Sequence, residues 1–253
     1  YIEIKNQAKF HPFKFLYALA SKAQQGGVEI FENTEVFSID QKTYPIEIAT
    51  LRARVKADWV IVATYAPFNQ PLKLYFKKAL YTSYVTEAHI SGGLIPEGLY
   101  EDTQNPYHYF RIDKGDDFDT MIIGGEDHRS DIPVNSLKCF KALAEYTRIL
   151  LGDIPYVTVK TWRGSILESI DGLAYIGPIH DKNILYATAF SGNGMTYAAI
   201  AADIMRDAVL LKENTWSELY DARRIPGLKK LLIKGRDYSQ ELYHGVIKNS
   251  FSV

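Results

Sequence analysis

The stretch "AFSGNGMTYAAIAADIMRDAVL", residues 189–210, decides the fold of this chain. A strand-like segment at residues 183–190 leads into the turn "SGNG", and that turn opens a long apolar helix. The first N–H groups of a helix have no partner within the helix and carry partial positive charge, so a helix start suits an anion. Glycines add no Cβ, which lets a flat or anionic ligand approach the backbone. An ordinary glycine-rich cap is the alternative interpretation, because a glycine motif alone is weak evidence.

Size and composition are those of an ordinary globular protein. The 253 residues suffice for one large domain or two modest ones, with 47% apolar and 23% charged residues. The net charge of -1 creates no field that would attract nucleic acid, and no apolar run is long enough to span a bilayer. Cys139 is the single cysteine, so no internal disulfide can form and a cytoplasmic location is the simplest expectation.

The first quarter of the chain predicts a helix followed by short strands. Residues 11–27 place Pro12 in the first turn and end in two glycines, which predicts a helix, and residues 28–31 predict a strand. Alternating apolar and polar residues then predict an antiparallel meander with strands at 34–40, 44–50 and 51–57. Residues 58–67 have a continuous apolar centre, which is typical of a strand buried on both faces.

The rest of the chain, from residue 72 onward, has a strand-rich stretch followed by a stretch with both strands and helices. Beyond residue 72, Tyr, Thr and Val are frequent, and the patterns predict these elements: strands at 80–91, 107–113, 120–124 and 156–167, strand-like segments at 173–179 and 183–190, and helices at 136–151 and 192–211. An α/β stretch is interrupted by a β-rich one and then resumes, so we expect an α/β (α+β) fold with an inserted antiparallel sheet. The expected division is a discontinuous domain of residues 1–71 and 155–214, an inserted domain of residues 72–154, and a C-terminal extension of residues 215–253.

Four segments, taken in order, resemble one flavoprotein family. They are "FHPFKFLYALASKAQQGGVEIFENTEVFSI" (10–39), "ADWVIVATYAP" (57–67), "WRGSILESIDGLAYIGPI" (162–179) and the opening stretch. Together they are similar to the D-amino-acid oxidase-like family, which includes glycine and sarcosine oxidases. The resemblance implies an FAD-dependent oxidoreductase that has an FAD-binding Rossmann-like domain, here partial, and an inserted substrate domain.

The resemblance also implies which residues contact the cofactor. The backbone at Gly192, Asn193, Gly194 and Met195 would face the pyrimidine end of the flavin, where N–H groups and the helix dipole stabilise negative charge. Gly177 would lie near the flavin. The adenine end would be contacted by Val36, Ala63 and Thr64. Val36 also fits a plain core-strand role, and the two roles are compatible.

The sequence departs from the family pattern in two ways. The phosphate-binding motif G-x-G-x-x-G does not occur, and the chain starts mid-pattern at Tyr1, so we expect a fragment that binds FAD weakly or not at all and is inactive by itself. The family's carboxylate-binding Arg is replaced by Ile166, while Arg163 falls on the opposite face of the same predicted strand. An amino-acid substrate is therefore in doubt.

Substrate contacts are expected on the strand "YHYFRID". Tyr107, Tyr109 and Arg111 recur at period two and share one face, so they can line a single cavity for a small-molecule substrate. A surface or sheet-packing role is the alternative. No catalytic base is assigned, because hydride transfer to flavin needs little more than positioning.

Two further motifs could in principle bind a metal ion or a partner. In "GGEDHR" (124–129), Glu126, Asp127 and His128 alternate in direction on an extended chain, so they make a poor ligand set and no metal is expected; a solvated turn or a domain contact is the favoured interpretation. Similar stretches occur in relatives with a Rieske iron–sulfur domain, which could act as electron acceptor outside this chain. No role is assigned to the other histidines, at positions 11, 89, 108, 180 and 244. The basic segment 223–236 favours packing with solvated charges, with phosphate or partner binding as the alternative.

The predicted function is oxidation of a small amine, amino acid or hydroxy acid by hydride transfer to FAD. A non-catalytic or assembly module that retains a flavoprotein fold is the alternative, supported by the missing phosphate motif and the Ile at position 166. A hydrolase of the α/β type is disfavoured, because no G-x-S-x-G motif occurs.

Overall fold

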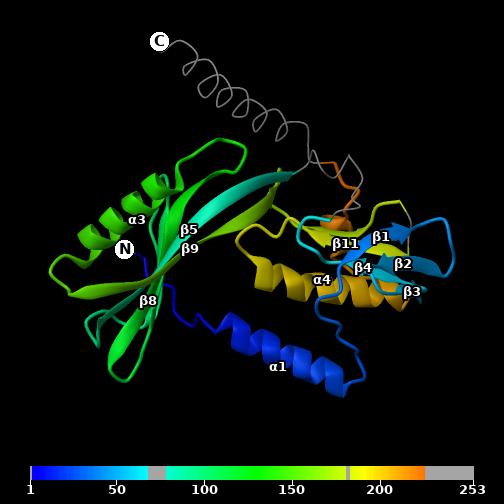
Figure 1. Ribbon diagram of the computed structural model, residues 1–253, viewed down its shortest axis with the longest axis horizontal. Coiled ribbons are helices and arrows are strands. Elements are labelled where there is room, and N and C mark those ends of the chain that lie inside the picture. Colours follow the sequence, from blue (N-terminus) through cyan, green and yellow to red (C-terminus); the bar gives the residue numbers. More distant parts are fainter. Residues whose placement is uncertain (1, 68–77, 181–182, 226–253) are drawn as a thin grey trace, which may run out of the picture.

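The computed structural model describes residues 2–67, 78–180 and 183–225. Within these residues the strands form a five-stranded sheet, a mixed three-stranded sheet and a three-stranded meander. Figure 1 shows the five-stranded sheet on one side of the molecule and the two smaller sheets on the other, with strands of the large sheet extending between them. The α/β (α+β) fold class with an antiparallel sheet is confirmed.

The five-stranded sheet is antiparallel and is covered on one face by a helix. Its spatial order is β6 (Gly98–Glu101), β7 (His108–Asp113), β8 (Phe118–Arg129), β5 (Lys78–Ser91) and β9 (Tyr156–Ser169). Helix α3 (Ser136–Leu151) packs on one face, and the buried core there consists of Tyr84, Ile90, Ile112, Met121, Ile123, Cys139, Leu143 and Leu151. The opposite face, which we call the open face, carries the alternate residues of each strand.

Strand β9 belongs to this sheet, although the sequence assigned residues 155–169 to the discontinuous domain. It pairs with β5 in antiparallel register from Lys78↔Ser169 to Ile90↔Tyr156. That long ladder pairs residues that lie 66 to 91 positions apart in the sequence, so the local pattern could not reveal it. The expected boundary at residues 71 and 72 lies outside the described residues.

The mixed sheet is the platform for the opening stretch. Its order is β10 (Tyr175–Pro178), β11 (Ile184–Thr188) and β4 (Val60–Val62), with β11 parallel to β4 and antiparallel to β10. Helix α4 (Gly194–Val209) packs on one face through a core that includes Ile176, Leu185, Ala201 and Ile204. The short helix α5 (Ser217–Tyr220) adjoins β10 through the bridge Ile176↔Asp221.

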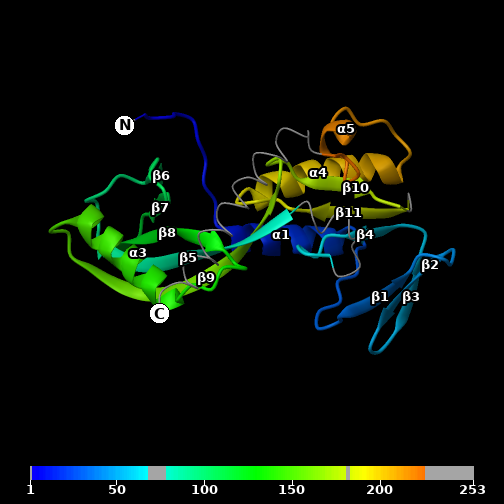
Figure 2. The same cartoon turned by 90° about the horizontal axis from the view of Figure 1, so that it is seen from above.

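The predicted meander forms, and it covers the other face of the mixed sheet. Its strands are β1 (Val36–Asp40), β2 (Ile46–Thr50) and β3 (Arg54–Ala57), paired in sequence order. Ile46 packs with Val62, Ile184 and Tyr186, so the meander lies across the sheet from α4 (Figure 2). Helix α1 (Pro12–Gln25) begins at an N-cap His11, as the Pro12 position predicts, but it buries none of its side chains.

Two strand predictions near the N-terminus are wrong. Residues 28–31 form no strand, and no described strand pairs with them, so the apolar pattern finds no hydrogen-bonded neighbour there. Residues 58–67 were expected to be buried on both faces, but only Val60–Val62 is strand and Ile61 is 51% exposed. Strand β4 lies at the edge of its sheet, and α4 does not cover Ile61.

Candidate functional site

The opening stretch lies at the carboxyl ends of two parallel strands. The loop after β4 carries Ala63 and Thr64, and the loop after β11 leads into "SGNG". The Thr188 Oγ1 hydroxyl donates a 2.6 Å hydrogen bond to the Tyr65 carbonyl, which holds the two loops side by side. In open α/β sheets ligands bind outside the carboxyl ends of the parallel strands, so both loops are placed for a cofactor.

The start of α4 differs from the starts of the other long helices. The N-caps of α1 and α3, His11 and Asn135, each accept a hydrogen bond through the side chain, whereas the α4 N-cap Asn193 makes no side-chain cap hydrogen bond. A Cβ added at Gly192 or Gly194 would meet nothing within 4 Å. The N–H donors of the first turn of α4 therefore carry no side-chain cap, and the space beside the glycines is open, as a flat electron-rich ring requires.

The turn is held in a demanding backbone conformation. Ala189 and Ser191 have φ angles of 60° and 52°, although neither is glycine. Left-handed residues other than glycine cost energy and concentrate at functional sites. The Ser191 N–H donates a 3.0 Å hydrogen bond to the Leu167 carbonyl in β9, so the turn is tied directly to the five-stranded sheet.

The structure brings only part of the predicted cofactor set together. Residues 192–195 lie at one helix start, and Ala63 and Thr64 follow β4 at the same sheet edge. Gly177 lies on β10 opposite Tyr186, away from that edge. Val36 begins β1 in the meander, where it pairs with Thr50 in a separate sheet.

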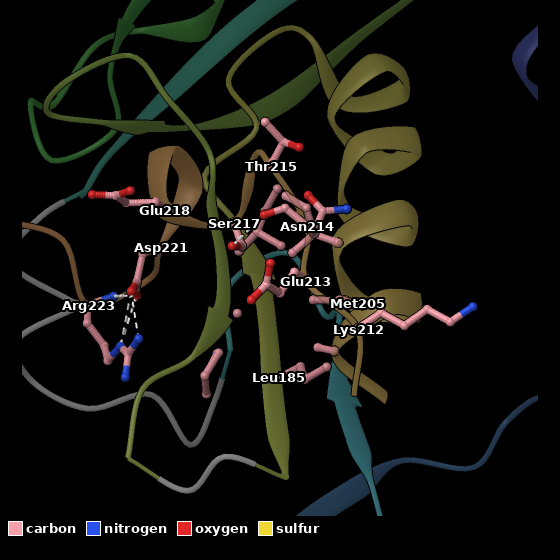
Figure 3. A pocket seen from close by; sticks show the side chains of 15 residues that line it. Leu185, Met205, Lys212, Glu213, Asn214, Thr215, Ser217, Glu218, Asp221 and Arg223 are labelled. Carbon is pink, nitrogen blue, oxygen red and sulfur yellow. Dashed lines mark hydrogen bonds and ion pairs between the residues drawn. The ribbon is translucent and has the colours of Figure 1, made fainter. Parts of the chain in front are cut away.

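A pocket of about 640 Å³ lies at the opposite end of α4 (Figure 3). It is lined by Gly177, by the C-terminal half of α4 and by the segment that follows it, including Asn214, Ser217 and Asp221. Arg223 at its rim is ion-paired with Asp221, with 2.7 Å between Nη2 and Oδ2. The pocket is therefore separate from the glycine turn.

The predicted substrate residues lie on the open face. Tyr109 pairs with Gly124, Gly124 with Val85, and Val85 with Trp162, which forms one row across four strands. A Cβ at Gly124 would collide with the Tyr109 ring, so the glycine lets that ring lie across the sheet. The Tyr107 ring is 6.0 Å from the Tyr109 ring, centroid to centroid.

Arg111 shares this face, but its guanidinium group already contacts Asp113 and the Phe10 carbonyl. Its Nη2 lies 2.7 Å from Asp113 Oδ1, and its Nη1 donates to the Phe10 carbonyl at 3.1 Å. Only its Nε is buried without a hydrogen-bond partner. The side chain is therefore oriented by Asp113 and by the segment before α1.

A bulge in β8 determines how "GGEDHR" is presented. Thr82 pairs with His128 and Tyr84 with Gly125, so Ser83 alone opposes two residues, Glu126 and Asp127. Gly125 and Glu126 have φ angles of 155° and 57°. Such a bulge re-aims side chains and is frequent beside active sites.

The three polar residues of this motif point to different neighbours. Glu126 Oε1 lies 3.0 Å from His108 Nε2, and His128 Nε2 lies 3.0 Å from the Tyr84 hydroxyl on the α3 side. Asp127 instead meets the Tyr107 hydroxyl on the open face, at 3.4 Å. The expectation of a solvated turn is wrong, because the bulge lets β8 continue to Arg129 with these residues half-buried.

Asp127 has an unusual electrostatic environment. Burial raises the pKa of its carboxyl above the usual range, and the nearby Ser83 hydroxyl, the hydrogen bond from Tyr107 and the neighbouring histidines only partly offset this. Burial and the nearby Asp127 charge likewise raise the pKa of Tyr107. Asp127 Oδ1 and Ser83 Oγ are both buried, and neither makes a hydrogen bond of good geometry. The Ser83 hydroxyl nevertheless lies close enough to lower the pKa of both Asp127 and Tyr109.

Asp127 and Ser83 were missed as substrate-site candidates. Asp127 was considered as a metal ligand and as part of a solvated turn or domain contact, and Ser83 carried no signal of its own. The usable signal was the glycine pair within a strand pattern, since glycine inside a strand often marks a bulge. Among the described residues no group of three or more His, Cys, Asp or Glu side chains could hold a metal ion.

Three further positions discussed from the sequence are Arg163 and Ile166 on β9 and Arg224 in the described part of the basic segment. Arg163 Nη1 donates to Ser136 Oγ at the start of α3, while Ile166 lies on the open face beside Tyr81. Arg224 is not solvated as expected: it pairs with Asp171 at 2.8 Å and stacks on Tyr175, with its guanidinium carbon 4.0 Å from the ring centroid. Residues 226–253 lie outside the described part of the chain. Over the described residues, no helix has the length and apolarity needed to cross a membrane.

Comparison with known proteins gives relatives at low identity. The chain is 28% identical over 253 residues to YhfW of Bacillus subtilis (strain 168), whose name assigns it to the Rieske 2Fe-2S iron–sulfur proteins; the match covers 97% of this chain and 49% of that protein. It is 22% identical over 235 residues to OrdL of Haemophilus influenzae, named as an oxidoreductase, with coverages of 88% and 52%. The chain thus spans about half the length of these relatives.

Solved structures share the fold. Glycine oxidase from Geobacillus kaustophilus aligns with a TM-score of 0.69 at 19% identity, over 83% of this chain and 57% of that one. L-proline dehydrogenase from P. horikoshii aligns with a TM-score of 0.68 at 20% identity, over 84% and 59%. A family model described as FAD dependent oxidoreductase (DAO) matches residues 2–208, which is most of the sequence. The chain therefore belongs to the DAO family of FAD-dependent oxidoreductases, whose cofactor is FAD.

Proposed function

We propose that this chain holds the flavin-facing turn and the substrate face of an enzyme that oxidises a small amine, amino acid or hydroxy acid. The supporting observation is one connection: the Ser191 N–H in the glycine turn is hydrogen-bonded to the Leu167 carbonyl of β9. Through it, a site for a flat cofactor and the open face of the large sheet adjoin each other. Substrate placed on that face would be presented to a ring seated at the turn.

The residues at the turn fit the pyrimidine end of a flavin. FAD, when bound, supplies the acceptor for a hydride from the substrate. The backbone at Gly192, Asn193, Gly194 and Met195 would then stabilise negative charge through N–H groups and the helix dipole. Ala63 and Thr64 would contact another part of the cofactor from the loop beside it. Gly177 and Val36 have weaker support, since they lie in other parts of the fold.

The open face supplies the proposed substrate contacts. Tyr107 and Tyr109 would pack against the substrate. Arg111, the next residue of β7 on the same face, would lie at the edge of the substrate site. We also propose that the substrate part of the molecule comprises residues 78–154 together with β9, since β9 completes its sheet. No base is assigned among the described residues.

Substitution of Gly192 tests the cofactor site. Gly192 has open space beside it and needs no left-handed backbone, so Gly192→Val should fold normally. Its isopropyl group would occupy the space proposed for the ring, and we expect FAD affinity to fall roughly tenfold or more, following the cost of a steric conflict. The measurement is quenching of FAD fluorescence on titration with the full chain.

A matched substitution controls for general effects of the added bulk. Gly92→Val also adds a side chain into space, with the nearest atom, Asp119 Oδ1, 4.0 Å from the new Cβ. It should leave FAD binding unchanged. Equal FAD affinity in the parent chain and Gly192→Val would contradict the proposed site.

A further inference from the structure

The centre of the open face has the composition of a cation site. Asp127 contributes a carboxylate, Tyr107 and Tyr109 contribute neighbouring rings, and Ser83 contributes a hydroxyl from the adjoining strand. Carboxylates and aromatic faces both attract ammonium groups. The bulge at Gly125 and Glu126 brings the carboxylate to this face.

Two buried oxygens at this site make no hydrogen bond of good geometry. Ser83 is only 4% exposed, and its Oγ lies near Asp127 and Tyr109 without completing a well-aligned hydrogen bond. Asp127 Oδ1 is likewise buried without a well-aligned donor. Unpaired buried polar atoms are costly, so in a folded protein each calls for a ligand or another partner. Both atoms can accept hydrogen bonds, and an ammonium group offers several N–H donors at once.

The arginines on this face are occupied by aspartates. Arg111 is paired with Asp113, and Arg129 is paired with Asp131. Arg163 lies on the other face, where it donates to Ser136. A substrate carboxylate would therefore have to displace an existing ion pair to gain a guanidinium contact.

Open space lies beside Gly164, the residue of β9 that faces Ser83. Gly164 of β9 pairs directly with Ser83, and a Cβ added there would meet nothing within 4 Å. The neighbouring Ile166, nearer the glycine turn, adds apolar surface without charge. The combination suits an amine whose carbon chain lies along β9.

We propose that Asp127 binds the positively charged nitrogen of the substrate, with Ser83 as a second acceptor and the rings of Tyr107 and Tyr109 beside it. The substrate is then a small amine recognised by its cation rather than by a carboxylate. This assignment rests on the proposed function for its meaning as a substrate site. The carboxylate itself is a specificity determinant, and no proton transfer is assigned to it.

Equilibrium binding to the full chain tests the assignment. The probes are n-butylammonium, n-butanol and butyrate, which share a chain length and differ in charge, titrated at pH 7.5 by isothermal calorimetry. We expect butylammonium to bind at least tenfold more tightly than butanol or butyrate. Asp127→Asn, which keeps the shape but removes the charge, should abolish that preference.

A matched variant separates local from general charge effects. Asp116→Asn removes a carboxylate from an exposed turn of the same sheet and should leave butylammonium affinity unchanged. Butylammonium binding no tighter than butyrate, or an Asp127→Asn chain that retains the parent affinity, overturns the assignment. Circular dichroism of both variants shows that each is folded.

The butylammonium titration and the FAD titration test the cation site and the cofactor site independently. The calorimetric readout requires no flavin reduction, so a chain that binds butylammonium through Asp127 supports the cation site whatever its redox activity. Loss of FAD affinity in Gly192→Val bears on the proposed cofactor site alone. The two results therefore distinguish failure of the inference from failure of the function.

Discussion

Single residues at the open face are held in states that folding alone does not favour. The half-buried Asp127 carboxyl has one fully buried oxygen, and the buried Ser83 hydroxyl makes no well-aligned hydrogen bond. Burial of such groups lowers the stability of the fold, and groups of this kind are found mainly at functional sites. Gly124 shows the complementary case, since the absent side chain is what admits the Tyr109 ring.

The raised pKa of Asp127 predicts how its replacement changes stability with pH. A carboxyl whose pKa is raised in the folded state favours the protonated form, so its burial destabilises the fold once pH exceeds the usual Asp range near 4. Asp127→Asn should therefore raise Tm at pH 8, by roughly 1–3 °C, and change it little at pH 4. Differential scanning calorimetry at both pH values measures the difference.

Four titratable groups face Asp127 and are left unchanged by this substitution. They are Tyr107, Tyr109, His108 and His128, all of which are present in both the parent and the variant. The exposed Asp116→Asn change should give a difference near zero at both pH values. A Tm for Asp127→Asn that is lower than that of the parent at pH 8 would show that the carboxylate stabilises the fold.

At the scale of elements, the β8 bulge decides which residues reach the site. Strand β8 continues past its glycine pair only because Gly125 and Glu126 adopt positive φ angles. Without the extra residue, Asp127 and His128 would exchange faces, since side chains alternate along a strand. The bulge therefore assigns the carboxylate to the open face and the imidazole to the α3 side.

Substitution of Gly125 tests the importance of that bulge. A Cβ at this position would lie 2.6 Å from His108 Cδ2 and 2.9 Å from the Tyr107 carbonyl, in a backbone conformation that favours glycine. Gly125→Ala should lower the free energy of unfolding by about 2–4 kcal/mol, the sum of strain and overpacking. Urea denaturation measures it, and Gly164→Ala, with open space at its Cβ, is the control.

A Gly125→Ala chain as stable as the Gly164→Ala chain would mean that the bulge relaxes freely. In that case the position of Asp127 on the open face would not depend on Gly125. The free energies of the two variants, measured side by side, decide between these possibilities.

At the scale of the whole molecule, the two sheets meet where the chemistry is proposed. The glycine turn belongs to the mixed sheet and Leu167 to the large one, and a hydrogen bond joins them. The relative YhfW is named as a Rieske 2Fe-2S iron–sulfur protein. Cys139, the single cysteine, is a buried residue of α3, so Cys/His ligands for a cluster would come from another chain or segment.

Electron transfer to such a cluster is the prediction at this scale. If the FAD-loaded full chain oxidises an amine anaerobically, an added Rieske-type 2Fe-2S ferredoxin should become reduced and show its electron paramagnetic resonance signal. Omitting the amine should leave the cluster oxidised. A flavin that is bleached by the amine while the ferredoxin stays oxidised would argue against an iron–sulfur acceptor.

Sequence reasoning was most accurate where structure depends on near neighbours. Helix α3 was predicted with the bounds Ser136–Leu151 because the apolar pattern of a helix is a local signal. The meander and the order of the strands followed from alternation in the same way. The strand at residues 28–31 failed, because a strand also needs a partner that its own residues do not specify.

The amino-acid sequence by itself determined most of the elements, their order and the glycine turn at the start of α4, since each depends on residues a few positions apart. Only the tertiary structure decided that β9 completes the large sheet and that Arg111 is held by Asp113. The same is true of Asp127, which the bulge in β8 carries to the open face beside Tyr107. These outcomes depend on strand register and on burial among distant segments, which periodicity along one segment does not encode.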